Sequence, residues 1–348
     1  MEAGPFCKMT PPPASSALAE SFAALLAWYR ANQREMPWRG HPDPYAVWVS
    51  EMMLQQTQVE TVRPYFARFL AAFPSIADLA AAEDEPLLKA WEGLGYYARV
   101  RNLRKAARLL VSNHAGTLPR TAAELQKLPG IGPYSAAAIA SICFGEAVPV
   151  VDGNVIRVFA RHNALPDDFS AQAPRRALAA WLTPFIQASG SPADFNQAMM
   201  ELGALLCTPH RPNCAACPLR NTCRAAAEGT PLDFPRPSPK KPLPTRREKV
   251  LLLRNTEGAL LLARHPGERL LAGFWELPQL DALPFPLPAK PRRHSTYCQT
   301  FTHFHLHQTI YASPPVPPVS LPDTFTWSLN PSALPLTTAT RKILAADR

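Results

Sequence analysis

The sequence predicts a mainly α-helical protein with a smaller α+β domain at its C-terminus. Residues from about Leu18 to Ala227 show apolar side chains at helical spacing. The composition then becomes rich in proline, and the segments beyond it have the pattern of strands. We therefore expect a helical domain at 1–227, a linker at 228–245 and an α+β domain at 246–348.

The first predicted helices have recognisable starts. The stretch Leu18–Tyr29 is rich in alanine and leucine at helical spacing. Asp43 and Pro44 then begin a second helix, because aspartate is a good N-cap and proline is tolerated at the first helical position. The run Tyr45–Gln58 is apolar on all sides, which indicates a helix buried deep in the domain.

A helix–hairpin–helix is predicted at 121–143. Residues 121–124 form a capping box, and the segment Leu-Pro-Gly-Ile-Gly-Pro-Tyr leads into an alanine-rich helix. Gly130 and Gly132 permit a tight turn, and Pro133 suits the first position of the second helix. Amides at such a helix start bind phosphate without base preference. The alternative is an ordinary corner between two helices in a core.

Four cysteines in the segment 207–223 form the most distinctive pattern of the chain. Their spacing is C-x6-C-x2-C-x5-C, and they are Cys207, Cys214, Cys217 and Cys223. Four thiolates on one short loop are a ligand set for a 4Fe-4S cluster. Zinc is the alternative, since four cysteines also suit a tetrahedral zinc ion. Zinc sites usually contain two C-x2-C pairs, and only one is present, so the spacing favours the cluster.

Two carboxylates are candidates for acid–base chemistry. Glu51 lies in the apolar second helix, where burial raises the pKa of a carboxyl group and makes it a general acid. Asp152 follows an apolar segment and should start a helix, where an aspartate stays ionised. One neutral and one charged carboxyl group can cleave a glycosidic bond. The alternatives are a buried salt bridge for Glu51 and a plain N-cap for Asp152.

The rest of the chain contains a stiff connection and short elements. Six prolines and two lysines fall in 228–245, which predicts an extended linker. Lys249–Leu253 and Ala259–Ala263 have the composition of strands and are joined by a turn at 256–258. A last short helix is expected at Thr338–Ala346.

The bulk composition restricts the class of protein. The chain has 348 residues, a net charge of +9 and a pI of about 9.3, which favours a polyanionic partner. Many soluble proteins are basic without binding one. No apolar run approaches a membrane span, the first residues have no signal-peptide pattern, and the cysteines suit a reducing compartment. We therefore expect a cytoplasmic protein without a membrane partner.

These motifs together resemble the endonuclease III superfamily, and within it the adenine DNA glycosylases of the MutY type. The resemblance covers nearly the whole chain. The supporting segments are the helix–hairpin–helix, the four-cysteine loop, Pro37-Trp38-Arg39, the run from Ser50 to Gln58, Gly93 to Arg99, Asp152 to Val155, and Phe195 to Met200.

The resemblance implies roles for the catalytic residues. Glu51 would protonate N7 of an adenine that is flipped out of the duplex. Asp152 would stabilise or capture the oxocarbenium ion, and Asn154 would position the reacting sugar. Tyr134 would pack against the nucleotide.

The resemblance also implies roles in DNA recognition. Arg39 and Gln197 would help to recognise the adenine. Gln55 and Tyr96 would act as wedges that hold the space from which the adenine leaves. For Tyr96 the alternative is a core aromatic, although Gly93 and Gly95 around it suit a protruding turn.

One position bears on the type of reaction. Endonuclease III relatives carry a lysine just after the hairpin, whose amine attacks the sugar and leads to strand cleavage. This chain has Tyr134 there. Some adenine glycosylases have a lysine two residues after the asparagine, and here that residue is Ile156. Water is therefore expected as the final nucleophile, with an intact strand as product.

The C-terminal domain resembles a Nudix fold without the acidic Nudix box, so we expect a recognition module rather than a pyrophosphatase. In the family it reads 8-oxoguanine through a Phe-Ser-His turn, which corresponds here to Phe301, Thr302 and His303. His303, His305 and His307 alternate along a strand and share one face. They could hold a metal, but ordinary polar-face residues are favoured.

We therefore expect a monomeric, monofunctional glycosylase with a 4Fe-4S cluster. Its partner would be duplex DNA that contains adenine opposite 8-oxoguanine or guanine, as in the bacterial nucleoid. Two alternatives compete with this reading. One is a bifunctional glycosylase/lyase of the thymine-glycol type. The other is a DNA-binding or redox-sensing cluster protein whose carboxylates are structural.

Overall fold

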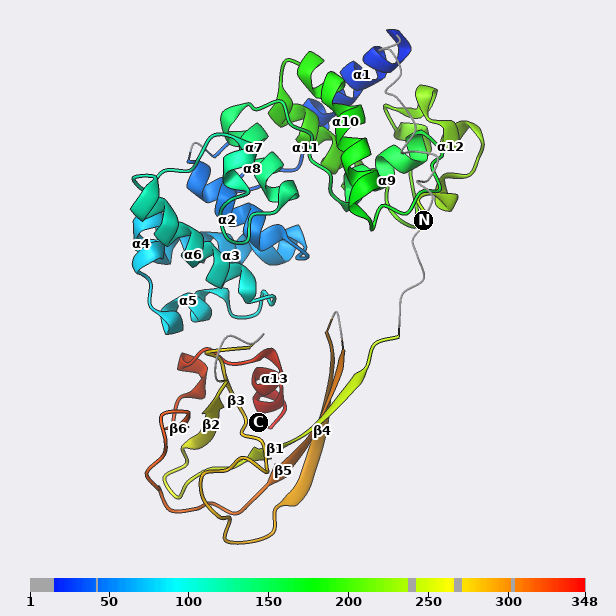
Figure 1. Cartoon of the computed structure of the whole chain (residues 1–348). Coiled ribbons are helices and arrows are strands. Elements are labelled where there is room, and N and C mark those ends of the chain that lie inside the picture. The colour runs from blue at the N-terminus through cyan, green and yellow to red at the C-terminus, as the bar shows by residue number, and fades with distance from the viewer. Residues whose placement is uncertain (1–15, 42, 237–241, 266–270, 302–303, 348) are drawn as a thin grey trace. The chain divides into compact units, whose positions relative to one another are not determined.

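The computed structural model describes residues 16–41, 43–236, 242–265, 271–301 and 304–347. The chain divides into two compact units. The first comprises Met1–Gln56 and Lys105–Pro239, and the second comprises Thr57–Arg104 and Lys240–Arg348. The second unit therefore combines a stretch of helices with the C-terminal residues. Figure 1 labels the elements of both units.

The first unit is helical, as the sequence predicts. Its helices are α1 (Ser16–Asn32), α2 (Pro44–Leu54), most of α6 (Ala98–Asn113), α7 (Ala122–Leu125), α8 (Pro133–Phe144), α9 (Gly153–His162), α10 (Gln172–Ala188), α11 (Pro192–Leu205) and α12 (Arg224–Ala227). Short 3₁₀ turns are η2 (Cys214–Ala216), η3 (Arg220–Thr222) and η4 (Pro231–Asp233).

Local sequence signals account for several helix ends. The Asp43 side chain caps α2 by accepting a hydrogen bond from the Tyr45 amide, and Pro44 is at the first helical position. Thr121 caps α7 by accepting from the Glu124 amide, as its capping box predicts. Helix α8 ends at Gly145, whose φ of +71° is the left-handed conformation that glycine adopts at low cost.

Helices α1, α9, α10 and α11 share one hydrophobic core. Its largest side chains are aromatic, and the rings of Phe22 and Phe185 are 4.8 Å apart. Phe159 and Trp181 meet edge to face at 4.7 Å between centroids. Burying such a side chain stabilises a fold by about 1.5–3 kcal/mol. Phe234, which lies in the expected linker, also packs against this core.

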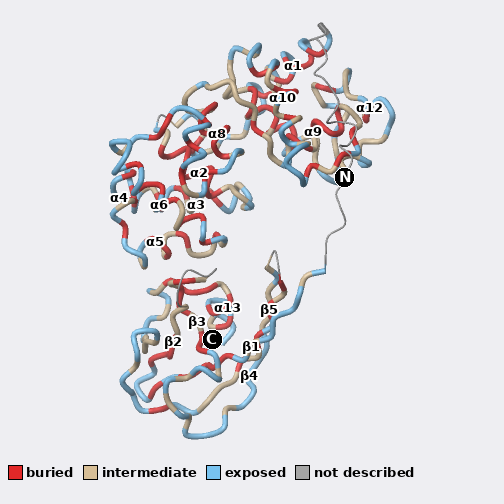
Figure 2. Tube along the Cα trace, in the orientation of Figure 1, coloured by how far each residue is buried: buried red, intermediate tan, exposed pale blue. Residues whose placement is uncertain are grey.

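Helix α2 packs against α8. All of the residues of α2 from Tyr45 to Met53 are buried, as its apolar sequence predicts, although the helix ends at Leu54 rather than at Gln58. The facing part of α8 is buried too, and its alanines at 136–138 and 140 allow a close approach of the two backbones. Figure 2 marks these buried positions in red.

The second unit begins with helices and continues with the C-terminal α+β domain. The helices are α3 (Val59–Ala72), α4 (Ile76–Ala81), α5 (Asp84–Trp91) and the first turns of α6. Phe69 of α3 packs edge to face on Trp91 at the end of α5, with ring centroids 5.6 Å apart.

In its described residues, the C-terminal domain contains two three-stranded sheets. The first has the order β1 (Thr245–Leu252), β5 (His305–Ala312), β4 (Arg292–Thr300), with β1 parallel and β4 antiparallel to β5. The second is antiparallel and has the order β3 (Trp275–Glu276), β2 (Leu260–Arg264), β6 (Phe325–Ser328). Helix α13 (Thr338–Ala346) contributes Ile343 to the core that the two sheets share.

The predicted fold class is confirmed, and the details differ at a few places. Helix α13 has the limits expected from the sequence. The two predicted strands exist and are joined by a turn in which Gly258 has a φ of +86°, but they belong to different sheets. Strand β1 also begins earlier than expected, at Thr245.

Candidate active site

Helices α2 and α8 bring Glu51 and Tyr134 into contact. Only 5% of Glu51 is exposed, and its Oε2 accepts a hydrogen bond of 2.9 Å from the Tyr134 hydroxyl. Burial raises the pKa of Glu51 to about 7; the Tyr134 bond acts in the opposite direction, and the charge of Asp152 adds to the increase. Glu51 is therefore a carboxyl group that holds its proton near neutral pH. The side chain that hydrogen-bonds to Glu51 is the phenol of Tyr134 and not the cation of a salt bridge.

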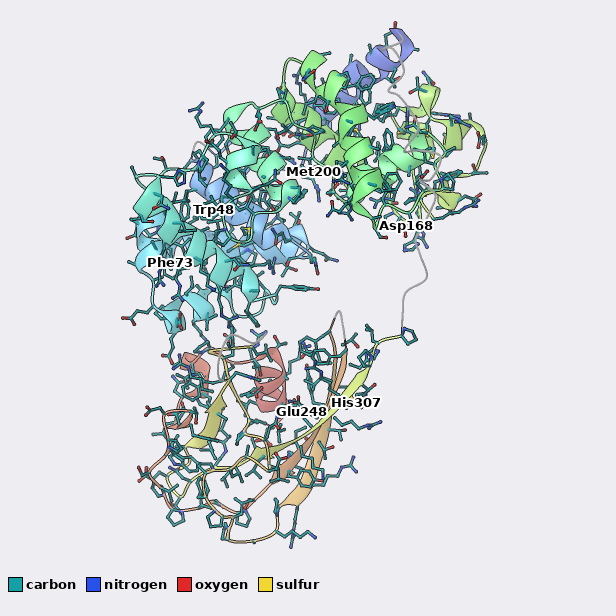
Figure 3. The ribbon with its side chains drawn as sticks, in the orientation of Figure 1. Trp48, Phe73, Asp168, Met200, Glu248 and His307 are labelled. Atoms are coloured by element: carbon teal, nitrogen blue, oxygen red, sulfur yellow. The ribbon has the colours of Figure 1, made fainter. Side chains whose placement is uncertain are left out.

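Tyr134 stays a hydrogen-bond donor in this site. Burial raises its pKa well above the usual value, and the charges of Glu51 and Asp152 raise it further. Its hydroxyl also lies 4.0 Å from the sulfur of Met200 on α11. Figure 3 labels Met200 and, on α2, Trp48.

Asp152 is the N-cap of α9, as the sequence predicts. Its Oδ1 accepts from the Val155 amide at 2.7 Å, and its Oδ2 accepts from the Asn154 amide group at 2.8 Å. Burial raises the pKa of Asp152, whereas these hydrogen bonds and the charge of Arg157 lower it. Asp152 thus combines a desolvated carboxyl group with three groups that favour its anion.

Arg157 connects Asn154 to the cysteine-bearing loop. One guanidinium nitrogen donates to Asn154 Oδ1 and to the carbonyl oxygen of Gly203, each at 2.8 Å. Its Nε donates to the carbonyl oxygen of Cys207 at 2.8 Å. A continuous hydrogen-bonded path therefore runs from Asp152 through Asn154 and Arg157 to Cys207.

A second polar group forms around Arg39 and Gln197. Arg39 Nε donates to Gln197 Oε1 at 3.0 Å, and another of its nitrogens lies 3.3 Å from Glu201 Oε2. Burial acts to raise the pKa of Glu201, but the hydrogen bonds from Arg34 and Arg39 outweigh it and lower the pKa. Glu201 is therefore an anion that holds the Arg39 guanidinium in place.

A cavity of about 330 Å³ lies beside this group and is lined by Arg39, Gln197, Tyr29 and Cys143, among others. Glu51 does not line it, although Val47, one helical turn before Glu51, does. Burial raises the pKa of Cys143 to about 12, and the charges of Glu51 and Asp43 contribute. The cavity is lined by polar and apolar side chains together and by a thiol that stays protonated.

The predicted hairpin is present between α7 and α8. Gly130 is exposed and has a φ of +81°, so the turn requires glycine there. Gly132 is also exposed and is the N-cap of α8, but its φ of −85° suits other residues as well. Leu128 and Ile131 are buried and anchor the turn, which leaves the glycines at the surface.

The four cysteines of 207–223 are half-buried and lie close enough to influence one another. Burial raises the pKa of Cys217 to about 11, and the charges of Cys207, Cys223 and Cys214 raise it further. Arg161 donates to Cys207 Sγ at 3.4 Å. In the part of the chain that the structure describes, His, Cys, Asp and Glu side chains form no group of three or more that could hold a single metal ion.

The two expected wedge residues lie at turns. Gln55 is the C-cap of α2 and donates from Nε2 to Ser135 Oγ at 3.0 Å. Tyr96, in the second unit, has a φ of +47° and is 37% exposed, so it is not the core aromatic that was the alternative.

Only part of the expected recognition turn can be described. The Phe301 amide donates to the Phe304 carbonyl oxygen at 2.8 Å, and their rings stack at 4.5 Å. Thr302 and His303 lie outside the described residues, so the expected alternation of His303 with His305 and His307 is described only for the last two. His305 and His307 share one face of β5, while Leu306 and Gln308 are buried on the other.

Comparisons with known proteins identify the family. Residues 49–184 match the HhH-GPD superfamily of base excision DNA repair proteins. The chain is 37% identical over 361 residues to the adenine DNA glycosylase of Homo sapiens, and this match covers 83% of this chain and 66% of that protein. It is 30% identical over 295 residues to the adenine DNA glycosylase of Buchnera aphidicola subsp. Schizaphis graminum, covering 81% and 84%. The chain belongs to the MutY-type adenine DNA glycosylases.

The fold of this glycosylase agrees with that of a solved relative. The structure of a thermostable thymine-DNA glycosylase is 25% identical and superimposes with a TM-score of 0.53 over 60% of this chain and 95% of that one. Members of the family hydrolyse N-glycosyl bonds in base excision repair of DNA. None of the described helices is both long and apolar enough to cross a membrane.

Sequence reasoning missed several residues of the glycosylase site. Arg157 and Glu201 were not singled out, although each is three or four residues from a candidate, Asn154 or Gln197, on the same helix. Residues at this spacing lie on one helical face, so the spacing could have drawn attention to both. Gly203, the third such residue, had no signal in a single sequence.

Gly203 allows α11 to approach the start of α9. A Cβ atom at this position would lie 2.6 Å from Asn154 Cβ and 3.0 Å from its Cα, so the helices would have to move apart. We predict that Gly203→Ala lowers single-turnover excision by about 10-fold or more, since displacements of about 1 Å can cost 10²-fold. The exposed neighbour Ala204→Ser is the matched control. An unchanged rate for folded Gly203→Ala would mean that Asn154 does not need its present position.

Proposed function

We propose that this chain is a monofunctional glycosylase that removes adenine paired with 8-oxoguanine, or with guanine, from duplex DNA. The observation that carries the proposal is the buried Glu51 carboxyl group, which is held by Tyr134 close to Asp152 and has a pKa of about 7. A neutral acid beside a hydrogen-bonded carboxylate is the pair that cleavage of an N-glycosyl bond requires.

The proposed reaction begins with extrusion of the adenine, since its N7 and the sugar cannot be reached together inside the stack. Glu51 donates its proton to N7, which makes the base a better leaving group. As the bond breaks, positive charge develops on the sugar, and the Asp152 anion stabilises or captures it. Asn154, held between Asp152 and Arg157, positions the sugar.

Water completes the proposed reaction. The position after the hairpin is Tyr134, whose hydroxyl is engaged with Glu51, and it has no amine that could form a Schiff base. Ile156, the other position considered, is 7% exposed on α9. The product would be an intact strand with an abasic site.

Contacts to DNA are proposed for several surfaces of the chain. The exposed Gly130 and Gly132 suit a phosphate, and Arg39 with Gln197 would recognise the adenine. Gln55 and Tyr96 would act as wedges. The exposed arginines of the cysteine loop would contact phosphates; they are Arg211, Arg220 and Arg224. Contacts to phosphates do not depend on the base sequence. We propose that the chain acts as a monomer in the bacterial cytoplasm.

A 4Fe-4S cluster is proposed for the four cysteines. The donor set fits, because the four thiols are half-buried and lie close together, and Arg161 already donates to Cys207 Sγ. Iron would take all four as thiolates and cross-link the loop. Arg161 also donates to the carbonyl oxygens of Thr208 and Pro209, so the loop is prearranged around this group.

The first test of the chemistry uses Glu51→Gln, which should bind the mismatched duplex but excise adenine roughly 10²–10⁴-fold more slowly, the usual value of general acid catalysis. In the unaltered protein, single-turnover excision should fall as the pH rises through about 7, because only protonated Glu51 can donate. Glu20→Gln on the exposed side of α1 is the control. A Glu51→Gln variant with near-normal excision would remove Glu51 from the mechanism.

Metal analysis tests the cluster. The purified chain should be brown and hold about four irons. Cys217→Ser should lose iron, whereas Cys298→Ser, on the exposed face of β4, should keep it. Zinc without iron after anaerobic preparation would contradict the assignment.

Recognition of the opposite base is tested with Thr302→Ala and His303→Ala. A lost hydrogen bond costs about 0.5–1.5 kcal/mol, so each variant should reduce the preference for 8-oxoguanine over guanine by a modest factor, and the double variant by more. Excision of adenine opposite guanine should change little. Thr296→Ala, on an exposed position of β4, is the control. An unchanged preference in the double variant would assign the C-terminal domain another task.

A further inference from the structure

The turn that carries Tyr96 has an unusual backbone. Gly93, Gly95 and Tyr96 have φ values of +102°, +71° and +47°. Glycine adopts this left-handed conformation readily, whereas for tyrosine it is sparsely populated. Arg99 supports the turn from inside by donating to the carbonyl oxygens of Leu94 and Gly95, each at 3.1 Å. Tyr96 itself projects and is 37% exposed.

The residue before this turn is held by the C-terminal domain. Glu92 Oε1 accepts a hydrogen bond of 2.8 Å from the Leu336 amide, and its Oε2 pairs with Lys89 at 2.7 Å. Lys89 donates in turn to the carbonyl oxygens of Ser332 and Leu334, at 2.6 and 3.1 Å. Glu92 and Lys89 together therefore bind one segment of the C-terminal domain at three backbone groups.

The residue after the turn is held by the same domain. The rings of Tyr97 and Phe274 lie 4.0 Å apart between centroids, and the two residues are 3% and 0% exposed. Burial raises the pKa of Tyr97, and the Thr338 side chain and the Gly93 backbone act in the opposite direction. A Cβ on Gly93 would collide with the hydroxyl of Tyr65 on α3 and would also meet Arg341 at 3.4 Å. The four residues of the turn are thus bounded on both sides by contacts to the C-terminal domain, and all of these residues belong to one compact unit.

We propose that Glu92 and Tyr97 are positioning residues through which the C-terminal domain sets the backbone of the Tyr96 turn. The inference rests on the proposed function, in which Tyr96 is a wedge. A strained turn keeps its geometry only when its surroundings hold it, and here the holding groups come from the domain proposed to read the opposite base. That domain then has two separable effects, one on the identity of the opposite base and one on extrusion of adenine opposite any base.

The experiment measures both effects in the full chain. Phe274→Ala should lower single-turnover excision about 10- to 100-fold opposite guanine and opposite 8-oxoguanine alike, since small displacements of positioning groups have effects of this size. The fluorescence of 2-aminopurine at the target position should show less extrusion. Glu92→Ala should act in the same direction, and Glu92→Gln should restore most of the loss because its amide oxygen can still accept from Leu336. Leu329→Ala, 75% exposed in the same domain, is the control.

A double-mutant cycle with Tyr96→Ala separates positioning from general damage. If the contacts act through the wedge, Phe274→Ala combined with Tyr96→Ala should be no slower than Tyr96→Ala alone. Losses that multiply, or a Phe274→Ala variant that changes the preference between opposite bases as Thr302→Ala does, would overturn the proposal. If Phe274→Ala fails to fold, the comparison of Glu92→Ala with Glu92→Gln decides in its place.

Failure of the proposed function gives a different result. If Tyr96→Ala leaves extrusion and excision unchanged, the wedge role is wrong and the positioning role fails with it. If Tyr96→Ala lowers extrusion while folded Phe274→Ala, Glu92→Ala and Leu329→Ala all behave like the unaltered chain, only the positioning role fails.

Discussion

The hydrogen bond between Tyr134 and Glu51 joins the two helices on which the proposed chemistry depends. A carboxyl group with 5% exposure in an apolar helix would be costly as an anion, so the surroundings keep it protonated near neutral pH. The phenol gives that group a partner without supplying a positive charge, which would have lowered its pKa. The apolarity of α2 and the small residues of α8 are therefore not only packing features. They create the electrostatic condition for proton donation.

The rest of the candidate site holds Asp152 and Asn154 in place. Arg157 uses its whole guanidinium group to join Asn154, Gly203 and Cys207, so α9, α11 and the cysteine loop meet at one side chain. Arg161, one turn later, holds the loop backbone in the same manner. A loop that contains no catalytic group thereby supports the residue that orients Asp152.

Local sequence patterns predicted most of the fold, whereas the resemblance to a known family supplied most of the candidate site residues, whose roles stay predictions. The caps Asp43 and Thr121 accept hydrogen bonds from amides a few residues away, and the apolar sequence of α2 is enough to predict that this helix is buried. Properties that depend on distant segments were harder to predict. The burial that raises the pKa of Asp152 is not visible in its local sequence, and the separation of β1 and β2 into two sheets depends on pairing with β5 and β6. The sequence around Tyr97 does not indicate a special role, because its packing partner Phe274 is distant in the chain.

The environment of Cys143 bears on how the protein resists oxidation. Thiols react with peroxide and with alkylating agents as thiolates. Burial raises the pKa of Cys143 to about 12, so this thiol stays protonated at neutral pH. A protein proposed to act on DNA that contains an oxidised base must work while oxidants are abundant. Burial therefore also protects Cys143, because the same kind of desolvation that keeps Glu51 protonated suppresses the form of sulfur that oxidants attack.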